Sequence, residues 1–159
     1  NLRSNGFSLA RRVLLERDQL PLEGPGYDGA HHSLADELLA PSVIFSPAIA
    51  ALQMAVDVRG VAHITGGGLP GNLNRVLPHG TAAEVTRGTW DVPPIFNEIQ
   101  RLGSVADDEM ARVFNMGVGM VVVVPESDSF KALDVARTAG HRATVIGRIV
   151  EGDGTVRIV

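Results

Sequence analysis

The sequence predicts an α/β (α+β) fold, in which a mixed central sheet is layered against flanking helices. Short apolar runs alternate along the chain with segments whose apolar residues recur at helical spacing. Hydrophobic residues make up 45% and charged residues 20% of the 159 residues, which is close to the composition of globular domains. A chain of this length buries a core of its own, so we expect residues 1–159 to form a single domain.

Helix-capping residues mark the start of three helices in the first third of the chain. Ser4 or Asn5 can cap the first helix, and Ser33 can cap the second. Ser46 is followed by a proline, which suits the first turn of a third helix. Glycine and proline residues separate these segments. The expected helices cover about residues 5–14, 33–39 and 46–56.

Strands and helices alternate in the rest of the chain. The run 117–124 is continuously apolar, which is typical of a strand buried on both faces. Two consecutive prolines, Pro93 and Pro94, open a helix, and Asp153-Gly154 favours a hairpin between the last two strands. The expected strands cover 60–64, 81–85, 117–124, 143–150 and 155–159, and the expected helices end at about residues 77, 102, 114 and 140.

Composition excludes several functional classes. The net charge is −4 and no basic run stands out, so we expect no nucleic-acid partner. The absence of cysteine excludes disulfides, thiolate catalysis and zinc–cysteine sites. No apolar run is long enough to span a membrane and no signal peptide is visible, so we expect a cytoplasmic protein with no membrane partner.

The stretch from His63 to residue 73 predicts a strand, a glycine turn and a helix. Gly66, Gly67 and Gly68 would let the backbone approach a ligand closely. The first amides of the helix and its dipole favour an anion, most often a phosphate. Alternatively, the glycines only permit a tight turn, and Thr65 caps the helix instead of binding a phosphate.

Two further asparagine-containing stretches are candidate sites. The opening Arg3-Ser4-Asn5-Gly6 offers charge and short polar groups ahead of a helix, although a plain N-cap explains the same pattern. Asn115 precedes glycines that enter a strand, where a bulge or the close approach of another backbone is the alternative.

The remaining polar candidates are weaker. Asn72 could reach a ligand or stay within its turn, and a lone histidine such as His63 is more often structural than catalytic. His31 and His32 are adjacent in a glycine-rich loop without a supporting carboxylate pattern, so we predict loop residues and no metal site. No nucleophile–base pair and no close carboxylate pair emerges, which indicates phosphate contacts without the reacting groups.

Three motifs together resemble the aminoimidazole ribonucleotide synthetase family, also called phosphoribosylformylglycinamidine cyclo-ligase. Residues 3–9, RSNGFSL, are similar to that family's HSNGYSL motif. Residues 63–68, HITGGG, match its H-[IL]-TGGG motif, and residues 114–120, FNMGVGM, are similar to its FNxGxGM motif. The resemblance extends from Ser4 to about Gly147. Within this range, the segment from Glu37 to Pro41 also fits the family.

The resemblance implies the C-terminal half of a two-domain enzyme. In that family the N-terminal half carries most of the ATP and Mg²⁺ contacts and builds the homodimer. The implied reaction is the ATP-dependent closure of formylglycinamidine ribonucleotide to aminoimidazole ribonucleotide, in purine biosynthesis. Residues 1–159 would then be a substrate-binding domain that is inactive alone, cut from a longer protein.

The resemblance also implies roles for the motif residues. Phosphate or ribose of the nucleotide would be held by the motif residues Arg3, Ser4, Asn5, Gly6, Thr65, Gly66, Gly67 and Gly68, with Asn72 and Asn115 beside them. His63 is the catalytic candidate. The chain has Arg3 where the family often has histidine, and arginine has no acid–base function at neutral pH.

Related families offer alternative interpretations. Selenophosphate synthetase, thiamine monophosphate kinase, a hydrogenase-maturation protein and formylglycinamidine ribonucleotide synthetase share the two-half architecture. A non-catalytic nucleotide-binding module is a further alternative. The co-occurrence of HITGGG and FNMGVGM favours the cyclo-ligase.

Overall fold

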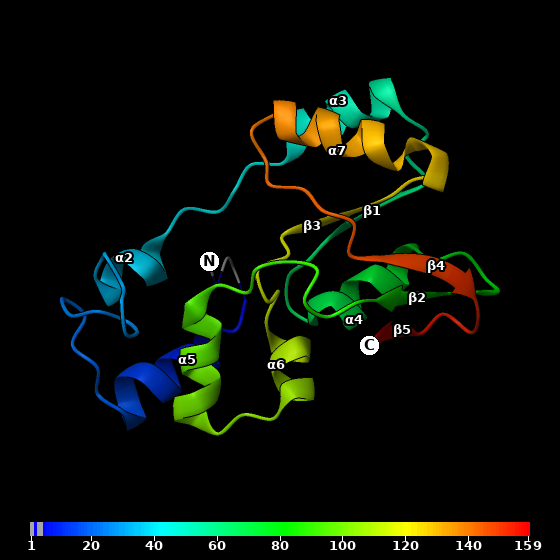
Figure 1. Cartoon of the computed structure of the whole chain (residues 1–159). Helices are drawn as coiled ribbons and strands as arrows, with labels where there is room; N and C mark the ends of the chain where they lie inside the picture. The colour runs from blue at the N-terminus through cyan, green and yellow to red at the C-terminus, as the bar shows by residue number, and fades with distance from the viewer. Residues whose placement is uncertain (1, 3–4) are drawn as a thin grey trace. The chain divides into compact units, whose positions relative to one another are not determined.

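A computed structural model describes residue 2 and residues 5–159 of the chain. The described elements confirm the predicted mixture of helices and strands (Figure 1). In chain order they are α1 (Phe7–Arg11), the π-helix η1 (Arg12–Arg17), α2 (Leu34–Leu39), α3 (Ser46–Ala55), β1 (Gly60–His63), α4 (Gly68–Leu73), the 3₁₀ helix η2 (Asn74–Val76), β2 (Thr81–Val85), α5 (Pro94–Gly103), α6 (Asp107–Val113), β3 (Met120–Val123), the 3₁₀ helix η3 (Glu126–Asp128), α7 (Ser129–Thr138), β4 (Gly147–Glu151) and β5 (Val156–Ile158).

The chain folds into two compact units, which we call unit 1 and unit 2. Unit 1 comprises Asn1–Ser42, Thr65–Gly71 and Asp91–Gly119. Unit 2 comprises Val43–Ile64, Asn72–Trp90 and Met120–Val159. Each unit is assembled from segments that lie far apart in the sequence, so neither is a continuous piece of chain.

Unit 1 is helical and has an apolar core. Most of the side chains in this core come from α1, η1, α2, α5 and α6, and the rings of Phe96 and Phe114 lie 5.4 Å apart. Both rings are fully buried. Burial of this apolar surface is the main favourable term in the stability of the unit. The core comprises Leu2, Ala10, Val13, Leu14, Leu34, Ile95, Phe96, Ile99, Met110 and Phe114.

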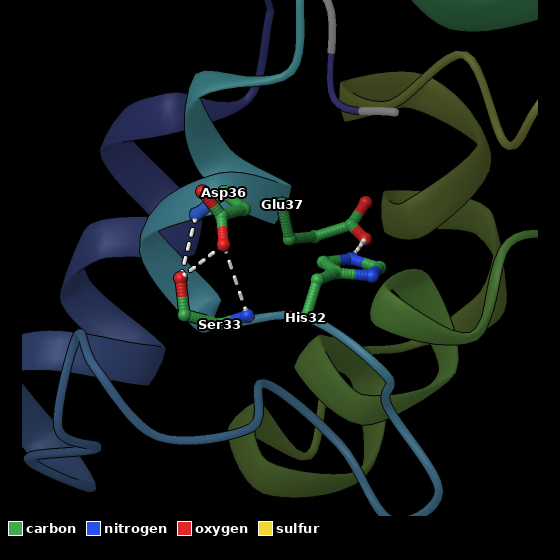
Figure 2. A network of polar contacts seen from close by, with 4 residues as sticks. All are labelled: His32, Ser33, Asp36 and Glu37. Atoms are coloured by element: carbon green, nitrogen blue, oxygen red, sulfur yellow. Dashed lines mark hydrogen bonds and ion pairs between the residues drawn. The ribbon is translucent and has the colours of Figure 1, made fainter.

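Helix α2 begins with the cap that the sequence predicts. Asp36 N donates to Ser33 Oγ at 3.1 Å, and Ser33 N donates to Asp36 Oδ2 at 3.2 Å (Figure 2). These reciprocal bonds form a capping box, which satisfies backbone amides that the first turn leaves unpaired.

The caps of the first and third helices differ from the prediction. Gly6 occupies the N-cap position of α1, with φ of 75° and no side-chain cap bond. The Asn5 side chain bonds elsewhere, and Ser4 lies outside the described residues. Phe45 is the N-cap of α3, again without a side-chain bond, although the predicted proline in the first turn is present.

Unit 2 contains the strands, which form two sheets. β1 and β3 pair antiparallel, with His63 opposite Met120. The other sheet has the order β4-β2-β5, in which β2 pairs antiparallel with β4 and parallel with β5. The expected hairpin at Asp153-Gly154 is therefore wrong: the turn exists, but β4 and β5 lie on either side of β2. Gly152 N and Gly154 N bond carbonyls of Gly80 and Thr81, so the turn crosses the start of β2.

Helices α3 and α7 lie side by side in unit 2 (Figure 1). Asp57 N, just beyond α3, donates to Asp128 Oδ2, just before α7, at 3.0 Å. The expectation that 117–124 is a strand buried on both faces is wrong, because all four residues of β3 are only half-buried. β3 is one of the two strands of its sheet, with β1 as its partner.

None of the helices in the described part of the chain combines the length and apolarity needed to cross a membrane.

Candidate functional site

The three motif segments of unit 1 meet at residues 111–119. These residues comprise the end of α6 and the loop that follows it, and we call them the turn. Asn5 Nδ2 donates to Val113 O at 2.7 Å, which ties the first motif to this turn. The glycine turn reaches the same place, since a Cβ built on Gly68 would lie 1.8 Å from Ala111 O. About 60 residues separate the first motif from the second in the sequence, and about 50 separate the second from the third. Their segments in unit 1 nevertheless form one local structure.

Two of the motif glycines are required by this packing. Gly6 has φ of 75°, and a Cβ on it would lie 2.1 Å from the buried ring of Phe114. Gly68 has φ of 59° and faces backbone carbonyls, which cannot move aside as a flexible side chain can. Any other residue at these positions would combine a steric clash with an unfavourable left-handed backbone.

Two backbone amides of the glycine turn and the helix after it already donate hydrogen bonds within this segment. Gly68 N donates to Thr65 O at 3.0 Å, and Gly71 N donates to Gly67 O at 2.9 Å. The expectation that the first helical amides all point outward unpaired is therefore wrong for Gly68. Its amide closes the turn and is not available to an anion.

Gly66 and Gly67 differ in what they tolerate. Gly67 has φ of 100°, which side-chain-bearing residues rarely adopt. Gly66 is exposed, its φ is not positive, and a Cβ on it would meet no atom within 4 Å. Gly66 is therefore the position in this turn where a side chain can be added without strain.

Among the described residues of unit 1, the buried polar side chains are those of Asn5 and Asn115, and both belong to the motifs. Asn5 is 6% exposed and Asn115 is 2% exposed. Asn115 Oδ1 accepts a long hydrogen bond of 3.4 Å from Gly117 N. A buried amide is costly unless its polar atoms find partners, so these asparagines are unlike ordinary core residues.

The glycines after Asn115 confirm the alternative of close backbone approach. Gly117 has φ of 94°, and a Cβ on it would lie 2.6 Å from Pro93 Cδ and 3.0 Å from Asp91 O. The turn is thereby held against the segment that leads into α5.

Comparison with known proteins identifies this arrangement. Residues 1–159 match the family model described as AIR synthase related protein, C-terminal domain. The chain belongs to this family. Its membership accounts for the co-occurrence of the three motifs, which lie far apart in the sequence and meet in unit 1.

The relatives of this AIR synthase related domain are similar over nearly its whole length. It is 48% identical over 158 residues to the phosphoribosylformylglycinamidine cyclo-ligase of Myxococcus xanthus, covering 99% of this chain and 46% of that protein. It is 44% identical over 155 residues to the protein of the same name from Synechococcus sp., covering 96% and 45%. The chain thus spans about half the length of the relatives it matches.

Solved structures share the fold of this domain. HypE of E. coli, a hydrogenase maturation protein, matches with a TM-score of 0.62 and 21% identity over 94% of this chain and 42% of that one. The thiamine-monophosphate kinase of Stenotrophomonas maltophilia matches with a TM-score of 0.61 and 16% identity, over 95% and 46%. At these identities the likeness concerns the fold alone, and it agrees with the predicted α/β class.

The other predicted site residues of the AIR synthase related domain belong to unit 2 or lie outside the described residues. His63 and Asn72 belong to unit 2. His63 is exposed at the end of β1, and its ring centre lies 6.5 Å from that of Phe45, whereas Asn72 is buried in α4. Arg3 and Ser4 lie outside the described residues.

The loop histidines have a partner that the sequence prediction missed. His32 Nε2 lies 2.7 Å from Glu37 Oε2, so a carboxylate does support one of them (Figure 2). Within residue 2 and residues 5–159, no group of three or more histidine or acidic side chains is placed to hold a metal ion.

The sequence interpretation also missed Phe114 and the carbonyls of Ala111 and Val113 as the elements that join the motifs. Phe114 opens the FNMGVGM motif, so its place in that motif was an available signal. The two carbonyls belong to the backbone and leave no pattern of side chains to detect.

Proposed function

We propose that this chain is the C-terminal half of an ATP-dependent cyclo-ligase that converts formylglycinamidine ribonucleotide to aminoimidazole ribonucleotide. The observation that carries this proposal is the 48% identity to a phosphoribosylformylglycinamidine cyclo-ligase over 158 residues. The convergence of all three motifs in unit 1 supports it, because the residues shared with the family then serve one site.

The proposed reaction closes an imidazole ring in two stages. The formyl oxygen of the substrate takes the terminal phosphoryl group of ATP, and ADP leaves. The amidine-side nitrogen then attacks the formyl carbon, and phosphate leaves with that oxygen as the ring closes. Such a reaction depends on holding nitrogen and carbon in contact and on stabilising charge on the transferring phosphoryl group.

We assign this chain the positioning role in that reaction. Asn5, Gly6, the turn Thr65–Gly68 and Asn115 would bind the ribonucleotide, since they meet in unit 1. Arg3, Ser4 and Asn72 would contribute further contacts. His63 is the proposed catalytic group, at the exposed end of β1.

The partners of the reaction are part of the same proposal. ATP and Mg²⁺ would be held mainly by an N-terminal half outside this chain, and that half would build a homodimer. The chain spans about half of its relatives, which supports a division of labour between two halves. We propose a cytoplasmic location for the enzyme.

An assay for aminoimidazole ribonucleotide tests the proposal. The full-length protein and residues 1–159 alone would each receive ATP, Mg²⁺ and formylglycinamidine ribonucleotide. We expect product from the full-length protein and none from residues 1–159. A folded full-length protein that hydrolyses ATP without forming the product would contradict the cyclo-ligase assignment and favour another ATP-dependent reaction.

A further inference from the structure

Three aromatic side chains of unit 2, which we call the aromatic cluster, lie close together at the end of β1. Phe45 is the N-cap residue of α3, His63 is the last residue of β1, and His141 follows the C-terminus of α7. Neither Phe45 nor His141 belongs to the three family motifs. The structure nevertheless groups both of them with His63, the proposed catalytic residue.

The Phe45 ring connects the two histidines. Its centre lies 5.3 Å from that of His141, with 38° between the ring planes. It lies 6.5 Å from the centre of His63, in a T-shaped arrangement with 69° between the planes. Aromatic rings attract each other at centre separations of about 4.5–7 Å, and T-shaped pairs are favoured over flat stacking. A change at Phe45 therefore alters the surroundings of both histidines.

Two helices anchor the inner members of the aromatic cluster. Phe45 and His141 are half-buried, whereas His63 is exposed. Ile49 N donates to Phe45 O at 3.0 Å in the first turn of α3, and His141 N donates to Ala136 O at 3.1 Å beyond the last turn of α7. These two helices lie side by side (Figure 1). His63 is therefore the accessible ring at the end of a series of anchored contacts.

An exposed catalytic histidine requires support of this kind. Proton transfer depends on an imidazole nitrogen within hydrogen-bond reach of the reacting group. An exposed side chain samples several rotamers, and a misplacement of about 1 Å lowers a rate by about a hundredfold. Contact with the anchored Phe45 ring favours the orientations of His63 in which the two rings meet. The aromatic cluster thus restricts His63 without covering it.

We propose that Phe45 and His141 are positioning residues, which act on the reaction through His63. His141 supports the Phe45 ring, and Phe45 holds the imidazole of His63 in its reactive orientation. The inference rests on the proposed function, in which His63 is the catalytic group. It adds two residues outside the motifs to the residues on which ring closure depends.

A double-mutant cycle in the full-length protein tests this proposal. The kcat and KM for formylglycinamidine ribonucleotide are measured for the parent, Phe45→Leu, His141→Leu and His63→Gln, and for Phe45→Leu combined with His63→Gln. Phe130→Leu is the matched control, because Phe130 is an exposed aromatic residue of α7. Hydrogen exchange of α3 and α7 verifies that each variant is folded, and Phe45→Met replaces Phe45→Leu if the latter is not.

We expect Phe45→Leu to lower kcat about threefold to tenfold at unchanged KM, as for one lost aromatic contact that orients the reacting group. His141→Leu should lower kcat about twofold, since it acts one contact further away. Phe45→Tyr retains the ring and should restore most of the loss. In the residual activity of His63→Gln, Phe45→Leu should have no further effect, because the ring that it positions is absent.

NMR of the histidine ring protons measures the positioning without relying on activity. The ring current of Phe45 acts on the carbon-bound protons of His63, whose resonances are assigned with His63→Gln. We expect Phe45→Leu to shift these resonances, His141→Leu to shift them less and Phe130→Leu to leave them in place. Unchanged His63 resonances in Phe45→Leu would contradict the contact itself.

Three kinetic results would overturn the proposal. In the first, Phe45→Leu leaves kcat unchanged. In the second, it raises only KM, which would make Phe45 a substrate contact. In the third, it lowers kcat by the same factor with and without His63, which would make Phe45 a purely structural residue. A folded parent protein that forms no product overturns the proposed function instead, and the NMR shifts still decide whether Phe45 positions His63.

Discussion

Unit 1 and unit 2 differ in how closely their side chains pack. Unit 1 has a cluster of buried apolar residues, and Gly6 and Gly68 pack directly against its last helix and the turn that follows. In unit 2, no residue of α7, a helix described in full, is buried, and Met54 and Phe130 are 91% and 85% exposed. Gly6 and Gly68 therefore pack tightly in unit 1, so their structural role must be separated from any role in binding.

The largest effect is expected at Gly68. Gly68→Ala would place Cβ against Ala111 O at φ of 59°, so we expect a loss of about 4 kcal/mol in the stability of unit 1. Gly71 lies in the same helix with open space around its Cβ position. Gly71→Ala should therefore stabilise by about 0.5 kcal/mol.

Hydrogen exchange of α5 and α6 in the full-length protein measures both changes, because it reports local opening. A Gly68→Ala variant as well protected as Gly71→Ala would show that the turn does not pack on Ala111 as described.

A comparison of substitutions at Gly6 and Gly29 separates two losses of stability, one from an unfavourable backbone φ and one from a clash with the core. Gly6→Ala should lose about 3 kcal/mol, because its Cβ would enter the Phe114 ring at φ of 75°. Gly29 has nearly the same φ, 78°, with nothing within 4 Å of its Cβ position. Gly29→Ala should therefore lose only about 1 kcal/mol. Equal losses in urea denaturation would contradict the role of Phe114.

Gly66 tests binding without a change of packing. Gly66→Asp adds a negative charge in open space, where we propose that the substrate phosphate lies. We expect the Kd of the ribonucleotide to rise about tenfold, and less at high salt, because charge repulsion is screened. The control Gly66→Ala should bind as the parent does. Unchanged affinity of Gly66→Asp, measured by calorimetry, would indicate that the glycine turn is only a connection.

The smallest expected effects are on the pH dependence of stability, through one exposed carboxylate in each unit. Hydrogen bonds from the Ser33 hydroxyl and then its backbone amide lower the pKa of Asp36 below 3.8. In unit 2, the Thr155 hydroxyl is the main cause that lowers the pKa of Asp153 below 3.8. Both contributions to stability are present above pH 3.8 and are lost as the pH falls through the lowered values.

Carboxyl-detected NMR titration checks these two groups. Ser33→Ala should raise the pKa of Asp36 alone, and Thr155→Val should raise that of Asp153 alone. A shift of both carboxylates in either variant would show that the two hydrogen-bonded pairs are not independent.

Local signals explain how much of the fold could be predicted. The cap at Ser33, the proline in the first turn of α3 and the strand 81–85 depend on neighbouring residues, and the structure confirms them. The pairing of β5 with β2 depends on a contact between distant segments, so the local signal at Asp153-Gly154 predicts a hairpin that the structure does not have.

The candidate site was predictable in its residues but not in its geometry. The three motifs are visible in the sequence, and their resemblance to one family grouped them. Their meeting point could not be predicted, because Gly68 contacts the backbone of Ala111 and Asn5 bonds the backbone of Val113. The distinction between Gly66, which tolerates a side chain, and Gly67, whose φ of 100° disfavours one, likewise depends on the backbone conformation.

A crystal structure of the full-length protein with formylglycinamidine ribonucleotide bound is the most direct test of the account. We expect the ribonucleotide in contact with the turn at Gly66 and Gly67 and beside the motif segments that contain Asn5 and Asn115. A bound ribonucleotide that touches neither the glycine turn nor the two asparagines would contradict the claim that the converging motifs form the substrate site.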